Sequence, residues 1–282
     1  MTTQRKIALV TGASQPNGIG RATALTLAKM GIDVAVTGLS HFEGAQSVAE
    51  EIKKLGRNSV AVKMDVGDYQ DVKKGIAEIK STLGPIDILI NNAAQMGQFI
   101  TIKNTDMAVW HKAIYTTLFS AFHCIKETWE DMCNNKWGRI VNMSSVAGVM
   151  GGYGQTSYGA AKAGIIGLTK SVALEGGRYN ITCNVVIVGS ARTDAPMADD
   201  VREKLEKRIL ARRSAEPQEI ADAIRYLVSD EAQYMTGSIM NMMGGGIGGF
   251  STVFLMEVVT YLAIPALASI MLLLLDSVIP SR

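Results

Sequence analysis

Two kinds of hydrophobic pattern alternate along the first 245 residues of the chain. Short apolar runs rich in β-branched residues predict buried strands, and longer segments with apolar residues at helical spacing predict helices. The predicted strands are Ile7–Val10, Asp33–Thr37, Ser59–Met64, Ile86–Ile90, Arg139–Met143, Thr182–Val188 and Ser238–Met242. The predicted helices are Ile19–Met30, Glu43–Leu55, Tyr69–Leu83, Asp106–Asn134, Tyr158–Gly176 and Pro217–Ser229. This alternation predicts an α/β fold, a doubly wound parallel sheet of about seven strands with helices on both faces.

The pattern changes near the end of the chain. We expect one large domain over residues 1–250 and a hydrophobic extension over residues 251–282. Residues 258–275 carry no charge, and a helix of 18 residues rises about 27 Å, close to the ~30 Å of a bilayer core. Lysines and arginines precede this run and only Arg282 follows it, which is consistent with an anchor that holds the domain on the cytoplasmic face of a membrane. A helix in an oligomer interface or over a cleft, or a tail altered by sequence change, are the alternatives.

Composition narrows the class of protein. With 282 residues, 48% hydrophobic and 19% charged, the chain can bury a large core. A net charge of +2 does not favour nucleic acid, so a phosphate ligand needs a local site. The spacing of Cys124, Cys133 and Cys183 fits neither a metal site nor a disulfide framework, which indicates a reducing, cytoplasmic compartment. The first apolar run, Ile7–Val10, is too short for a signal peptide.

The sequence TGASQPNGIG, residues 11–20, joins the first predicted strand to the first predicted helix. At such a junction the free N–H groups of the helix N-terminus and the helix dipole can face an anion. Gly12, Gly18 and Gly20 allow the turn and let a pyrophosphate approach the backbone. The alternative is an ordinary strand-to-helix turn.

A second group of residues indicates proton transfer. Tyr158 and Lys162 are four apart on a predicted helix and so share one face. A nearby ammonium lowers the pKa of a tyrosine from about 10 toward neutrality, where the phenol can act as a general acid or base. The apolar strand GRIVNM ends in Ser144 and Ser145, at the sheet edge where α/β folds bind ligands. Taken alone, the Tyr–Lys pair is also common by chance.

The motifs TG…GIG, NNAA at 91–94, SSVAG and YGAAK, in this order and spacing, resemble the short-chain dehydrogenase/reductase superfamily over about residues 5–246. The run AEPQEIADAIRYLVSDEAQYMTG at 215–237 is most similar to the 3-oxoacyl-thioester (3-oxoacyl-[acyl-carrier-protein]) reductase group. The resemblance implies a Rossmann-type, NAD(P)-dependent oxidoreductase that interconverts a secondary alcohol and a ketone. It also implies a homodimer or homotetramer and makes a thioester-linked ketone a candidate substrate.

The resemblance implies roles for individual residues. Tyr158 would exchange a proton with the substrate oxygen, Ser145 would hydrogen-bond that oxygen, and Lys162 would lower the pKa of the tyrosine and hold the nicotinamide ribose. Asn91 would lie near a ribose, Asp65 near adenine and Thr193 near the carboxamide. The full set of implied cofactor contacts is Gly12, Ser14, Asn17, Gly18, Ile19, Gly20, Asp65, Val66, Asn91, Ala93, Tyr158, Lys162, Gly189 and Thr193.

Three departures from the family pattern stand out. Five residues separate Gly12 from Gly18 where the family usually has three, so that Gln15–Asn17 make the phosphate loop longer. Val188 precedes Gly189 where the family has proline. Thr117, a candidate catalytic residue, stands where the family has an asparagine that helps to hold a proton-relay water. These changes leave an alternative open, a non-catalytic nucleotide-binding subunit of a hetero-oligomeric dehydrogenase.

The cofactor and the substrate are less constrained. No carboxylate follows the second strand before Glu43, which removes the charge that selects NAD. Ser40 and His41 are candidates to bind a 2′-phosphate, which slightly favours NADP(H) over NAD(H), although His41 is also typical of a surface loop. The resemblance implies that residues 190–213 form a flexible lid over the active site, and the basic residues of this segment could attract the phosphates of a coenzyme A or carrier-protein thioester. The alternative is a solvated helix face above a buried stripe of Val201, Leu205 and Ile209.

Overall fold

Seven parallel strands form one sheet in the order β3-β2-β1-β4-β5-β6-β7. The computed structural model describes residues 5–95, 99–195 and 197–245. The strands are β1 Ile7–Val10, β2 Asp33–Gly38, β3 Ser59–Lys63, β4 Ile88–Asn91, β5 Gly138–Ser145, β6 Ile181–Val188 and β7 Ile239–Met242. The expected doubly wound parallel sheet is confirmed. Because the strand order reverses between β1 and β4, a crevice opens there at the carboxyl ends of the strands.

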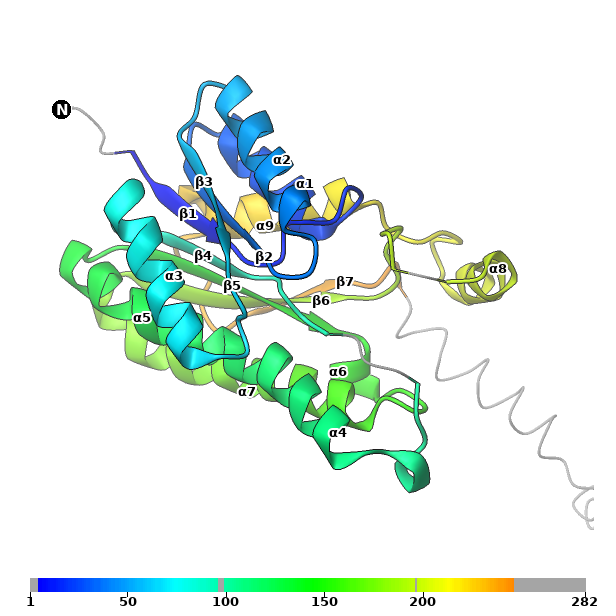
Figure 1. The fold of residues 1–282 in the computed structure, drawn as a ribbon. Coiled ribbons are helices and arrows are strands. Elements are labelled where there is room, and N and C mark those ends of the chain that lie inside the picture. Colours follow the sequence, from blue (N-terminus) through cyan, green and yellow to red (C-terminus); the bar gives the residue numbers. More distant parts are fainter. Residues whose placement is uncertain (1–4, 96–98, 196, 246–282) are drawn as a thin grey trace, which may run out of the picture. The chain divides into compact units, whose positions relative to one another are not determined.

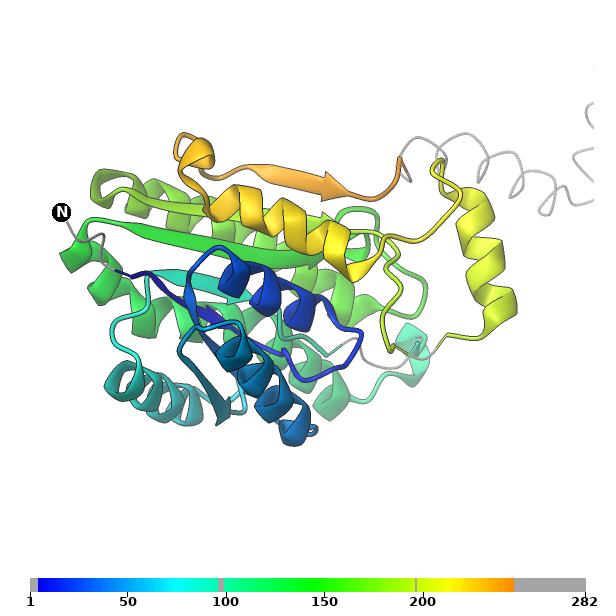
Figure 2. The ribbon, with the colours of Figure 1, turned by 90° about the horizontal axis from the view of Figure 1, so that it is seen from above.

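Helices cover both faces of the sheet (Figure 1). The helices α1 Ile19–Lys29, α2 Phe42–Lys54 and α9 Pro217–Val228 pack on one face, as Figure 2 shows from above. The opposite face carries α3 Tyr69–Thr82, α5 Ser120–Asn135 and α7 Thr156–Gly176. The remaining helical segments are η1 Ile102–Asn104, α4 Met107–Ile114, η2 Tyr115–Phe119, α6 Ala147–Met150, η3 Gly177–Tyr179, α8 Asp199–Arg208 and η4 Asp230–Ala232.

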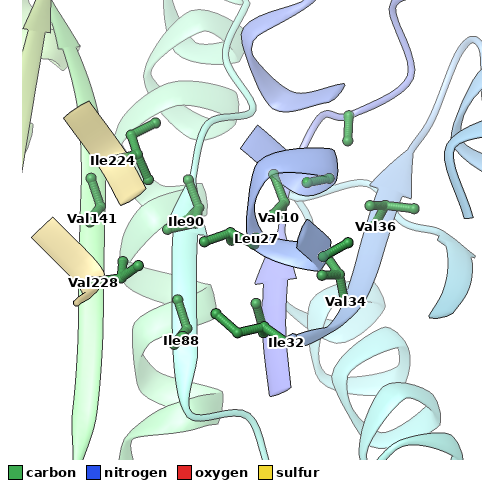
Figure 3. Packing of buried hydrophobic residues seen from close by; sticks show 14 of the residues in the cluster. Val10, Leu27, Ile32, Val34, Val36, Ile88, Ile90, Val141, Ile224 and Val228 are labelled. Atoms are coloured by element: carbon green, nitrogen blue, oxygen red, sulfur yellow. The ribbon is translucent and has the colours of Figure 1, made fainter. Parts of the chain in front are cut away.

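The face beneath α1 and α9 shows how the helices bury the sheet (Figure 3). Leu27 of α1 lies over Val10 of β1 and Ile90 of β4, and Ile224 of α9 lies over Val141 of β5. All five side chains are fully buried. Burying each contributes about 1.5–3 kcal/mol of transfer free energy. This packing fixes the strand ends that carry the site.

One predicted helix is interrupted. The helical pattern over 106–134 predicts a continuous helix, but α4 and α5 are separated by a π-helical turn, η2, in which the N–H of Ser120 bonds to the carbonyl of Tyr115. Asp106 caps the start by accepting a hydrogen bond from the N–H of Ala108 at 2.6 Å. A π-helical turn inserts a residue without breaking the apolar stripe, so hydrophobic spacing does not reveal it. Such turns are frequent at functional sites.

Residues 197–214 and 243–245 belong to a second compact unit, distinct from the unit formed by the sheet and the other helices. In α8 of this second unit, Lys204 pairs with Asp200 at 3.1 Å and Lys207 pairs with Glu203 at 2.6 Å. The predicted buried stripe is wrong for α8 itself, because Val201 is 49% exposed and the helix has no buried residue. Ile209, the one buried member, follows the helix.

The apolar run at 258–275 lies outside the described residues. Within the three described ranges, the helices are all too short or too polar to cross a bilayer.

Candidate active site

A cleft of about 620 Å³ opens at the carboxyl ends of β1 to β4. Its size suits a small-molecule or cofactor ligand. The predicted site residues that line it are Gly12, Ser14, Gly18, Ile19, Gly20, Asp65, Val66, Ala93, Tyr158 and Thr193. The structure therefore brings the phosphate loop, the adenine-side residues and the tyrosine to one cavity.

Glycines shape the phosphate loop. Gly12 has a φ of +67°, and a Cβ on it would lie 2.9 Å from the Cα of Ala93. A Cβ on Gly20 would lie 2.5 Å from the carbonyl oxygen of Gly12 and 2.7 Å from the Nδ2 of Asn92. The loop is therefore folded tightly against the β4 end, with the N-terminus of α1 at the cleft. The backbone N–H groups at the N-terminus of α1 fit the pyrophosphate of a dinucleotide.

Asn92 holds this loop in place. Its Nδ2 donates to the carbonyl oxygens of Thr11 and Gly12, each at 2.9 Å. The hydroxyl of Thr11 in turn accepts from the N–H groups of Asn92 at 3.1 Å and Ala93 at 3.0 Å. Asn92 also lines the cleft, and sequence reasoning missed it.

Asn91, the residue expected near a ribose, does not line the cleft. It is the last residue of β4, is 6% exposed, and donates from Nδ2 to the Oδ1 of Asn142 on β5 at 2.8 Å. Its neighbour Asn92 lies beyond the strand. The predicted strand ends at Ile90 and so does not separate the two asparagines, whereas in the structure Asn91 still belongs to β4 and Asn92 reaches the cleft.

The proposed catalytic side chains lie together. Ser145 ends β5, where its hydroxyl accepts a hydrogen bond from the N–H of Ala147 at 3.2 Å, and it lies close enough to Tyr158 on α7 to lower the pKa of the phenol. The Nζ of Lys162 lies 5.6 Å from the centre of the Tyr158 ring and donates to the carbonyl of Met143 at 2.7 Å. The one-turn spacing on α7 and the end of β5 are sufficient to form this triad.

The protonation of the pair differs from expectation. Burial raises the pKa of the Tyr158 phenol above its ordinary value of 10.0, and the hydrogen bond from Ser145 opposes this. Burial lowers the pKa of Lys162 from 10.5 to about 7. The expected lowering of the Tyr158 pKa by Lys162 is not found, because burial removes much of the lysine charge near neutral pH. The phenol is held protonated, which suits it to donate a proton.

Thr117 is buried at the centre of η2 behind the cleft wall. Its hydroxyl accepts a hydrogen bond from the N–H of Gln95 at 3.4 Å. Gln95, the donor of this bond, and Thr116, the chain neighbour of Thr117, both line the cleft. The structure thus places Thr117 next to the site as support for its wall.

Besides Asn91, three predicted cofactor residues lie outside the cleft lining, and one of them is Lys162, which is buried. Gly189 continues β6 and donates its N–H to the carbonyl of Met242 at 3.0 Å. Asn17 bonds to Arg192 and Asp194. The lining residues that sequence reasoning did not place in the site are Gln15, Thr37, Gly38, Leu39, Met64, Asn92, Ala94, Gln95, Lys112 and Thr116.

The end of β2 carries hydroxyl and imidazole groups toward the cleft. Ser40 and His41 line it together with Leu39, and Asp65 is the carboxylate among the lining residues. Cys124, Cys133 and Cys183 are free thiols.

Comparisons with known proteins agree with this geometry. The family model described as enoyl-(acyl carrier protein) reductase matches residues 12–246. The chain is 41% identical to nodulation protein G of Azospirillum brasilense over 243 residues, which covers 86% of this chain and 98% of that protein. It is 40% identical to the 3-oxoacyl-[acyl-carrier-protein] reductase FabG of Escherichia coli K12 over 247 residues, 87% of this chain and 98% of that protein. The FabG of Staphylococcus aureus Mu50 is also 40% identical, over 243 residues, 85% of this chain and 97% of that protein.

Proposed function

The chain belongs to the short-chain dehydrogenase/reductase family and is an NAD(P)-dependent oxidoreductase, and from this premise we propose that it interconverts a 3-oxoacyl thioester and the 3-hydroxyacyl thioester. The observation that carries the proposal is the group Ser145, Tyr158 and Lys162 beside a cleft with a glycine-rich phosphate loop. The relatives named 3-oxoacyl-[acyl-carrier-protein] reductases support the substrate class.

The cofactor supplies or accepts a hydride at the substrate carbon. The chain's own residues hold the substrate oxygen and its proton. Ser145 donates a hydrogen bond to that oxygen, and the protonated Tyr158 phenol gives it a proton as the carbonyl becomes an alcohol. The raised pKa of Tyr158 keeps the phenol protonated at neutral pH, which is the form that the reduction of a ketone needs. Lys162, anchored on Met143, positions the ring.

We assign NADP(H) as the preferred cofactor. Ser40 and His41 offer hydrogen bonds at the end of β2, where an NAD-selective enzyme of this fold has a carboxylate. Residues 38–42, at the end of β2, contain no carboxylate to repel a 2′-phosphate, and the lining carboxylate Asp65 follows β3.

We assign a cytoplasmic homodimer or homotetramer. Free thiols fit a reducing compartment. Large apolar side chains are exposed along α4, η2 and α5, a pattern typical of an interface between subunits; they are Met107, Val109, Tyr115, Phe119 and Phe122.

The test is turnover of purified protein with NADPH and, separately, NADH. Absorbance at the reduced-nicotinamide band is followed with 3-oxoacyl thioesters and with ketones that lack the thioester. We expect faster oxidation of NADPH, and a loss of on the order of 100- to 10,000-fold in kcat for Tyr158→Phe with cofactor binding retained. Tyr153→Phe is the matched control, because Tyr153 is 88% exposed and lies five residues earlier.

Two results would contradict this assignment. Full activity in Tyr158→Phe would remove the tyrosine from the chemistry. Tight NADPH binding with no turnover of any carbonyl compound would favour the alternative function, a non-catalytic nucleotide-binding subunit, which the comparisons do not support. Thr117→Asn would then test whether an asparagine at this position restores turnover.

A further inference from the structure

The lengthened phosphate loop is bonded to a segment far along the chain. The backbone N–H of Asn17 donates to the Oδ2 of Asp194 at 2.7 Å. The Nδ2 of Asn17 donates to the carbonyl of Arg192, also at 2.7 Å. Asn17 belongs to the part of the loop that exceeds the family length, so these bonds belong to this chain's own loop.

The segment that receives these bonds is held at its other edge. The N–H of Arg192 donates to the carbonyl of Ala215 at 2.8 Å, and the N–H of Ala215 donates to the carbonyl of Ser190 at 2.9 Å. The residues 190–194 therefore form a strip with Ala215 along one edge and Asn17 along the other.

The strip and the loop both border the cleft. Thr193, between the two residues that Asn17 contacts, lines the cleft, and so do Gly18 and Ile19, which follow Asn17. Hydrogen bonds between Asn17 and the strip therefore join the two walls at that place. A ligand that lies on the phosphate loop and reaches Thr193 therefore lies next to these bonds.

We propose that Asn17, Arg192 and Asp194 form a clasp over the nicotinamide half of the bound dinucleotide, with Asn17 as a positioning residue that slows release of the cofactor. Asn17 and Asp194 are both exposed, so water competes for these bonds and the clasp can open in every catalytic cycle. The inference depends on the dinucleotide and not on the identity of the ketone.

Four variants separate the two bonds. Asn17→Ala removes the bond to Arg192, and we expect NADPH to dissociate about fivefold faster, as the loss of one neutral hydrogen bond implies. Asp194→Ala removes a charged acceptor, and we expect about tenfold. Asn17→Asp sets a second carboxylate beside Asp194 and should release NADPH at least as fast as Asp194→Ala. Asp194→Asn keeps an acceptor oxygen and should stay near the parent rate.

The measurement is stopped-flow fluorescence of NADPH displaced from the full-length protein by excess unlabelled cofactor, repeated with NADH. Equilibrium binding of a half-ligand, which lacks the nicotinamide half, is measured in parallel. The half-ligand is adenosine 2′,5′-bisphosphate for comparison with NADPH and AMP for comparison with NADH. Asn135→Ala, at the exposed end of α5, is the matched control substitution. Neither measurement needs turnover, so a wrong substrate assignment does not affect the outcome.

Faster dissociation of the dinucleotide with unchanged binding of the half-ligand supports the clasp, and so does a raised KM for the cofactor with kcat equal to or above the parent value. Dissociation rates in Asn17→Ala and Asp194→Ala that match the parent rate overturn it. Equal weakening of the dinucleotide and the half-ligand also overturns it, because this would show general damage to the phosphate loop.

Discussion

At the scale of single residues, Lys162 shows how burial changes chemistry that spacing predicts. Its place one turn after Tyr158 brings the ammonium near the ring, as expected, at 5.6 Å from the ring centre. The side chain is also only 3% exposed, and this burial lowers its pKa to about 7. Desolvation outweighs the charge effect that the pattern suggested.

The lowered pKa of Lys162 makes stability depend on pH. Between about pH 7 and pH 10.5 the unfolded chain binds the lysine proton and the folded chain does not, so the free energy of unfolding rises with pH, by at most about 1.4 kcal/mol per unit. Below pH 7 both states are protonated and this slope disappears. We expect Lys162→Met to remove the rise in urea unfolding at pH 7, 8 and 9 without cofactor. Lys170→Met, exposed on the same helix, should keep it; identical slopes in parent and Lys162→Met would refute the prediction.

At the scale of elements, the turn from β1 into α1 depends on a close approach of backbones. Gly20 has no room for a methyl group, since its Cβ would lie 2.5 Å from the Gly12 carbonyl. The same turn places the N-terminus of α1 at the cleft. A substitution that disturbs the packing of this turn therefore also disturbs the backbone N–H groups that bind an anion.

We therefore expect Gly20→Ala to displace the phosphate loop and to lower kcat/KM for NADPH on the order of 100-fold. Gly167→Ala is the matched control, because Gly167 lies inside α7 and its Cβ would meet nothing within 4 Å. There the alanine should stabilise the helix by up to about 1 kcal/mol. Steady-state kinetics and thermal unfolding of both variants test this, and parent-like kinetics in Gly20→Ala would show that the loop has more freedom than its contacts indicate.

At the scale of the whole molecule, the enzyme and the C-terminal extension are separable in sequence. The family match ends at residue 246, and within the described residues those that line the cleft lie between Gly12 and Thr193. We expect deletion of residues 251–282 to leave kcat and cofactor KM within about twofold of the parent, because the deletion removes none of the described residues that line the cleft.

The same deletion tests the membrane hypothesis for residues 258–275 by cell fractionation. A parent protein in the membrane pellet and a deletion variant in the supernatant would support an anchor. A parent protein found in the supernatant without detergent would rule it out. Loss of turnover in the deletion variant would instead favour a helix that completes an oligomer or the cleft.

Several features were predictable because they depend on neighbours along the chain. Alternating apolar runs placed all seven strands, and most strand ends lie within one or two residues of the structure. The end of a predicted strand and the start of a predicted helix placed Ser145 and Tyr158 near one edge of the sheet, and the motifs that resemble the family then proposed them as catalytic residues. The π-helical turn was not predictable, since it leaves the apolar spacing of the 106–134 segment intact.

By itself, the sequence determined the order of strands and helices and the glycine-rich turn, because each depends on local spacing and backbone freedom, and its motifs supplied the candidate proton-transfer residues through their resemblance to the family. Tertiary structure decided which of two adjacent asparagines faces the cleft, which protonation state the Tyr158–Lys162 pair prefers, and that Asn17 meets Asp194. These outcomes depend on burial and on contacts between segments up to 177 residues apart. Burial and hydrogen bonds between distant segments do not appear as a regular spacing of residues, so the sequence pattern does not predict them.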